Sequence, residues 1–183
     1  MKRILMCTGL LFAATTLLAQ QPPAKKPPLS PPATATAAVN GKTITITYSS
    51  PRVKGREGKI YTSDGLISHD PHYPVWRAGA NAATTLTTDS DLMIGNLTVP
   101  AGTYTLFVDI SDPAHWVLIV SKATGEWGLA YDPTKDLGKT PMTMSKPPAM
   151  VEDLTYTLNI DNGNGTLTLA WEDVNASVNV MVH

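Results

Sequence analysis

Two short segments of this 183-residue chain carry the residue types best suited to binding. Residues 52–56 place three cations at alternate positions, and residues 76–81 set a tryptophan beside an arginine and end in asparagine. An arginine fork binds the oxygens of anions and sugars, and an indole face stacks on rings. The segments therefore predict a site for a small polar, anionic or sugar-like ligand, formed by Arg52, Lys54, Arg56, Trp76, Arg77 and Asn81.

The second segment also has a structural interpretation, which we favour for its arginine. Arg77 and Asn81 have the donors needed to hold loop carbonyls or a buried acid, while Trp76 fills the core. On this interpretation Arg77 organises the loop before the next strand. Both interpretations remain open at the level of the sequence.

Other chemistry receives less support from the residue pattern. His69 and His72 flank an Asp-Pro pair, but Pro71 prevents a helix from placing both imidazoles on one face, so we expect a surface loop there and no metal site. His115 is expected to be an exposed histidine at the start of a strand. The chain has no Gly-x-Ser-x-Gly motif and no glycine-rich phosphate loop. We assign no catalytic residue and no cofactor.

The elements that must position these residues are strands. Residues 43–48 alternate strictly between threonine and apolar side chains, so that Ile44, Ile46 and Tyr48 share a face. Gly95-Asn96 and the Asn-Gly pair at 162–163 are typical of tight hairpin turns. Further strands are expected over residues 83–88, 92–94, 97–99, 103–110, 116–120, 154–160, 167–171 and 178–182. Residues 140–145 are compatible with a short edge strand, limited by Pro141. About eight or nine short strands without a convincing helix predict an all-β fold, a single antiparallel sandwich or a jelly-roll-like barrel.

The first 38 residues are expected to lie outside this domain. Lys2 and Arg3 precede an apolar stretch that ends at Ala19, which is typical of a signal peptide over residues 1–19. Residues 20–38 contain six of the fifteen prolines and are expected to form a disordered leader. We therefore place the β domain at residues 39–183 and expect export to the periplasm or the medium, with no transmembrane segment after cleavage.

Composition and charge narrow the classes of partner. The chain is 43% hydrophobic and 16% charged, which is too apolar for general disorder. Its net charge is -1 and would become -3 after removal of Lys2 and Arg3, so nucleic acid is not an expected partner. Cys7 is the only cysteine and lies in the expected signal peptide, which leaves no disulfide to stabilise the domain.

Three motifs in order resemble the bacterial DUF2911 family. They are residues 48–56, residues 75–81 and residues 100–107, and the closing Trp171-Glu172 pair extends the resemblance over residues 39–183. The resemblance implies an exported, β-rich bacterial domain without an established activity. The chain departs from the usual pattern at Ala82, where members often have an acid, and in a longer stretch over residues 57–73.

These observations lead to one expected function and two alternatives. We expect a non-catalytic envelope or secreted module that binds a small polar or carbohydrate-like ligand or an envelope component. The first alternative is a hydrolase or isomerase on a sandwich scaffold, and the second is a purely structural envelope protein. The oligomeric state is open.

Overall fold

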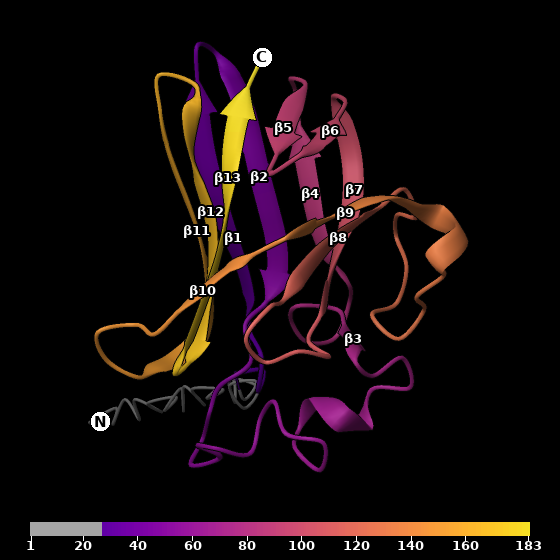
Figure 1. Cartoon of the computed structure of the whole chain (residues 1–183), viewed down its shortest axis with the longest axis vertical. Helices are drawn as coiled ribbons and strands as arrows, with labels where there is room; N and C mark the ends of the chain where they lie inside the picture. Colours follow the sequence, from indigo (N-terminus) through magenta and orange to yellow (C-terminus); the bar gives the residue numbers. More distant parts are fainter. Residues whose placement is uncertain (1–26) are drawn as a thin grey trace, which may run out of the picture.

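Two antiparallel β-sheets packed face to face form the computed structural model, which describes residues 27–183 (Figure 1). The first sheet has the order β1-β2-β4-β7-β8-β9, with β3 also paired to β7. Its strands are β1 (Pro32–Val39), β2 (Lys42–Ser49), β3 (Val75–Trp76), β4 (Thr84–Thr88), β7 (Gly102–Asp109), β8 (Val117–Ser121) and β9 (Asp136–Pro141). The predicted signal peptide lies outside the described residues.

The second sheet has the order β11-β12-β13-β5-β6, with β10 also paired to β13. Its strands are β5 (Leu92–Ile94), β6 (Leu97–Val99), β10 (Thr143–Ser145), β11 (Val151–Asp161), β12 (Asn164–Glu172) and β13 (Val174–Val182). The β1 edge packs against β11 and the β9 edge against β6, without closing into a barrel. The prediction of an antiparallel sandwich is confirmed, and the jelly-roll-like barrel is not formed.

Within the described residues the sandwich has thirteen strands and two short 3-10 turns, at Ile67–His69 and Pro133–Lys135. The predicted number of strands was too low because several are only two or three residues long and carry little periodicity. None of the helical turns in this part of the chain is long and apolar enough to cross a membrane.

The face of β2 that its alternating sequence predicts to be buried is the face that packs into the core. Ile44, Ile46 and Tyr48 are buried, and the intervening threonines lie on the other face. At the β11–β12 turn, Asn162 and Gly163 both have positive φ, 48° and 82°, as a two-residue hairpin of this kind requires. The hairpin predictions at 95–96 and 162–163 are confirmed.

The prediction of a disordered leader up to residue 38 is wrong for β1. Pro32–Val39 pairs with β2 along its full length, from Pro32 opposite Ser49 to Val39 opposite Lys42. Ala35 and Val39 point into the core, whereas Thr34, Thr36 and Ala38 are exposed. Proline is tolerated because it stands at the first residue of an edge strand, where a missing N–H interrupts no ladder.

A cluster of aromatic side chains, one of them from β3, occupies one end of the core. Trp76, Trp116 and Trp171 are buried, and the rings of Trp76 and Trp171 stack with centroids 5.9 Å apart. Tyr61, from the long connection between β2 and β3, contacts all three indoles edge-on. Trp171 lies on the inward face of β12 with Leu167 and Leu169, which are also buried.

Candidate functional site

A cavity of about 470 Å³ opens at this end of the sandwich, between the β2–β3 connection and the loop that follows β3. Its lining includes five of the six predicted binding residues, namely Arg52, Lys54, Arg56, Trp76 and Arg77. His69 and Asp70 also line it, and its apolar part comes from leucines, Ile67 and two indoles. We call it the basic cavity because its lining has four arginine or lysine side chains and one carboxylate.

The first cations are placed by a short extension of β2 that crosses to the other sheet. Residues 50–54 run beside the start of β11, where Val53 N–H donates to the Glu152 carbonyl and Leu154 N–H donates to the Pro51 carbonyl. Val53 is fully buried, so its neighbours Arg52 and Lys54 point outward. The spacing of Arg52 and Lys54 therefore reflects one buried residue between two exposed ones.

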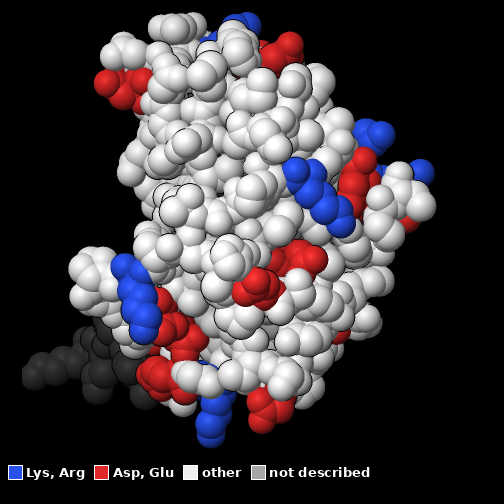
Figure 2. All heavy atoms as spheres, in the orientation of Figure 1, with Lys and Arg blue, Asp and Glu red and all other residues white. Residues whose placement is uncertain are grey.

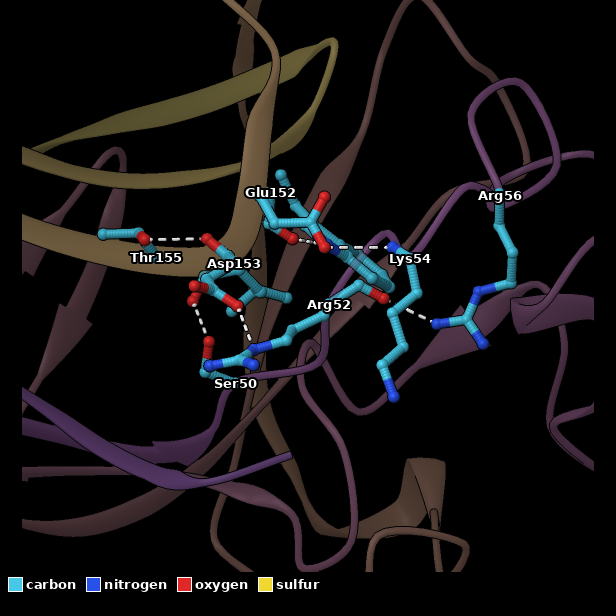
Figure 3. Close-up of polar contacts among 9 residues, drawn as sticks. Ser50, Arg52, Lys54, Arg56, Glu152, Asp153 and Thr155 are labelled. Carbon is cyan, nitrogen blue, oxygen red and sulfur yellow. Dashed lines mark hydrogen bonds and ion pairs between the residues drawn. The ribbon is translucent and has the colours of Figure 1, made fainter. Parts of the chain in front are cut away.

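Arg52 and Lys54 differ in how their charges are used. The Nε of Arg52 donates to Oδ1 of Asp153 at 2.7 Å in an exposed ion pair. The main-chain N–H of Lys54 donates to Glu152, whereas its ammonium end points away from that carboxylate (Figure 3). In the described part of the chain the Lys54 ammonium forms no ion pair, so its charge is available to a ligand.

Arg56 has a largely structural role in the same segment. Its Nε donates to the Val53 carbonyl at 3.1 Å, and another guanidinium nitrogen donates to the Arg52 carbonyl at 2.6 Å (Figure 3). These bonds hold the turn at Lys54-Gly55, where both residues have positive φ, 51° and 70°. Arg56 therefore fixes the position of Lys54 and adds positive charge to the rim.

Arg77 has the acid partner that the sequence did not reveal. Its guanidinium lies 3.7 Å from Oδ2 of Asp70, and a second nitrogen donates to the Asn81 carbonyl at 3.3 Å. The Asp70 side chain is only 4% exposed, and its Oδ1 accepts the His72 N–H. Both a loop carbonyl and a buried carboxylate are thus held by Arg77, as its structural interpretation requires. Arg77 nevertheless lines the basic cavity.

The pairing between Arg77 and Asp70 is incomplete. Oδ2 of Asp70 and Nε of Arg77 are both buried without a hydrogen-bond partner among the described residues. Buried polar groups are normally satisfied, and exceptions concentrate where a ligand or water is to be bound. Two residues of the cavity lining, Asp70 and Arg77, thus each keep one unsatisfied polar atom, an acceptor and a donor respectively.

The loop after β3 is held rigidly from within the protein. Ala78 and Asn81 have positive φ, and the Ala78 carbonyl accepts hydrogen bonds from Thr84 and Tyr156. The Asn81 side chain donates to the Ser30 carbonyl at 3.5 Å and does not line the cavity. The structure therefore does not place the Asn81 side chain with the other five predicted binding residues.

The loop over residues 122–131 packs against the Arg77 side chain through Gly128. Gly128 approaches so closely that an added Cβ would overlap the Arg77 side chain and the Asn81 carbonyl. His72 donates through Nε2 to the Leu129 carbonyl at 2.9 Å, which ties this loop to the β2–β3 connection. His69 donates through Nδ1 to the Gly65 carbonyl, so both histidines contribute to loop structure.

Charge on the face shown in Figure 2 is scattered in small groups, and no continuous basic surface crosses it. Burial raises the pKa of Glu172, which lies outside the basic cavity and whose carboxylate accepts the Gly58 N–H. Burial also raises the pKa of Tyr61 above its ordinary value. Paired carboxylates suited to glycoside hydrolysis are not brought together on the described lining of the cavity.

Comparison with known families gives one match. Residues 30–180 match the family described as a protein of unknown function (DUF2911). The chain belongs to the DUF2911 family. No curated protein matches it, and no solved structure does. The DUF2911 match begins before β1, in agreement with that strand being part of the domain.

Within this DUF2911 domain, sequence reasoning missed Asp70 and the apolar rim of the cavity. Asp70 lies between the two histidines of the connection over residues 57–73, whereas the family pattern often has its acid at position 82. Ala82 instead forms an isolated bridge with Trp127. The only sequence signal for Asp70 is an acid between a histidine and a proline. Such a pattern is common in loops and is therefore weak.

Proposed function

We propose that this DUF2911 domain is an exported, non-catalytic module that binds a small anionic ligand in the basic cavity. The observation that carries the proposal is the charge of the lining, which has a single carboxylate, that of Asp70, and four cationic side chains, those of Arg52, Lys54, Arg56 and Arg77. Such an imbalance over a concave, partly apolar surface favours anions. The cavity volume of about 470 Å³ is within the usual range for small-molecule sites.

The contacts that these cations make within the protein determine what each can contribute to ligand binding. Arg56 and Arg77 are held by main-chain carbonyls and set the shape of the wall, while Arg52 shares its charge with Asp153. Lys54 has an uncommitted ammonium on an exposed side chain. Lys54 is therefore the group whose charge an incoming anion would neutralise most directly.

Binding is tested with the full chain and inorganic phosphate, citrate and glucuronate, with glucose as a neutral control. Calorimetry should show that the anions bind, that glucose does not, and that affinity falls as salt rises. Lys54→Gln should weaken anion binding about tenfold, the loss of one charge-assisted hydrogen bond. Lys42→Gln makes the same charge change at the far end of β2 and should have no effect.

Two results would overturn the proposal. One is the absence of binding by every anion, and the other is an equal loss in the Lys54→Gln and Lys42→Gln variants, which would make the effect one of net charge. Binding of glucose but no anion would instead favour a neutral carbohydrate as the ligand.

Export rests on the residue pattern before Gln20. Protein recovered from its native host should begin near Gln20 and contain no thiol, because Cys7 would have been removed. Intact mass and a thiol titration measure both properties. A mature chain that still contains Cys7 would contradict cleaved export.

A further inference from the structure

The rim of the basic cavity is unusually apolar for a charged site. Seven large hydrophobic side chains in the described residues are more than a third exposed, and three of them line this cavity. They are Leu29, which is 75% exposed, and Leu66 and Leu129, each 38% exposed. They come from three separate segments, before β1, before the first 3-10 turn and in the loop over residues 122–131. Exposed apolar side chains that gather at a cavity mark a surface to be covered.

The floor of the cavity offers apolar contact as well. Trp76 and Trp171 reach the lining together with Ile67. The indole N–H of Trp76 donates to the Gly79 carbonyl at 3.2 Å, and that of Trp171 donates to the Glu152 carbonyl at 3.3 Å. Because both polar ends are used within the protein, these tryptophans have only carbon atoms to offer a ligand.

Charged and apolar parts of the lining are contributed by different segments. The cations with outward side chains, Arg52 and Lys54, lie on the extension of β2, whereas Leu66 and Leu129 come from the two loops. A ligand that satisfies both parts of the lining must therefore combine a negative charge with an apolar portion. A compact polyanion would leave the leucines exposed to water, and a neutral hydrocarbon would leave the cations without a partner.

We propose that the ligand is a free anionic amphiphile, a hydrocarbon chain that ends in a single carboxylate. The carboxylate lies at Lys54 and Arg52, and the chain lies over Ile67 between Leu66 and Leu129. This inference rests on the proposed function, because it specifies the anion that the basic cavity takes.

The test is a chain-length series on the full chain by calorimetry, below the micelle-forming concentrations. Straight-chain carboxylates from butanoate to decanoate should bind with an affinity that rises about fourfold for each added CH₂ until the cavity is full. Citrate serves as an anion without a chain, and octyl glucoside as a chain without charge. Citrate and octyl glucoside should each bind more weakly than decanoate.

Two variants separate the contribution of apolar contact from that of charge at the cavity. Leu66→Ser should weaken decanoate binding about tenfold and leave citrate binding unchanged, whereas Lys54→Gln should weaken both. Met181→Ser changes a similarly exposed apolar residue near the end of β13 and should alter neither.

The outcomes distinguish this inference from the proposed function. If citrate binds and the affinity of the carboxylates does not change with chain length, the amphiphile inference is wrong and the proposed anion-binding function stands. If no anion binds, both the inference and the proposed function are wrong. Octyl glucoside binding as tightly as the carboxylate of equal chain length would overturn the requirement for charge. Binding to anionic phospholipid vesicles without binding to monomeric decanoate would overturn the inference in favour of a membrane surface.

Discussion

Arg77 is the residue whose replacement tests the architecture of the cavity most directly. Its guanidinium bridges the Asp70 carboxylate and the Asn81 carbonyl, and so connects the β2–β3 connection to the loop that follows β3. Arg77→Ala would leave the Asp70 carboxylate, 4% exposed, with one hydrogen bond, that from the His72 N–H. The variant should therefore be destabilised through an orphaned charge.

The size of the effect follows from the burial of the pair. Breaking a buried ion pair by removing one partner costs about 3–5 kcal/mol. Because Arg77 is 20% exposed and the pair is 3.7 Å apart, we expect the lower end, about 3 kcal/mol. For a domain of this size that loss lowers Tm by about 6–12 °C. Arg77→Lys keeps the charge but cannot hold both acceptors, so its destabilisation should approach that of Arg77→Ala.

A double-mutant cycle with Asp70→Asn supplies the control. Removing the acid as well removes the orphaned charge, so the double variant should be more stable than the sum of the single losses predicts, by about 1–2 kcal/mol. Chemical denaturation at neutral pH measures all four chains. Additive losses, or Arg77 variants that melt like the parent, would refute the reasoning and leave Arg77 with only a binding role.

Three further changes probe the surrounding structure. Trp171→Ala should cost about 3–5 kcal/mol in chemical denaturation, since it empties a core position next to Trp76; an unchanged midpoint would contradict its burial. The pKa of Glu172 is raised by burial above its ordinary value of 4.5, so folding favours its protonated form and this contribution is lost as pH rises through the folded-state pKa. The Tm of Glu172→Gln relative to the parent should therefore increase from pH 4 to pH 8, and a constant difference would contradict the shift. Gly128→Ala should lower stability by about 1–3 kcal/mol, because the added methyl group overlaps the Asn81 carbonyl; a variant as stable as the parent would show that the loop moves freely.

Strands with strict alternation were predictable because burial of one face leaves a two-residue period in the sequence. β2 and the β11–β12 hairpin are examples, and both are found in the expected register. β1 was missed because its inward residues are mainly alanines, whose small side chains give a weak period, and because the prolines before it suggested a disordered chain.

The candidate site was predictable only in part. Residues 52–56 and Arg77 attract attention by residue type alone, and the structure brings them to one cavity. Asp70 and the three leucines of the rim were not predictable, since their roles arise from where loops meet in space. A single leucine in a loop is ordinary in any protein, and only the convergence of several at one cavity is informative.

The position of β1 at the edge of its sheet also determines which fragments of this protein will behave well in isolation. A chain shortened to begin at Val39 would expose the whole backbone edge of β2, a strand that already carries Ile44 and Ile46 on its buried face. An uncovered edge of that kind is a template for strand addition between molecules and hence for aggregation. In the intact domain β1 covers this edge, and the prolines at 31 and 32 remove N–H donors where the outermost strand begins. Pro31 and Pro32 thus limit strand addition where β1 begins, and fragments made for expression should begin before Pro31.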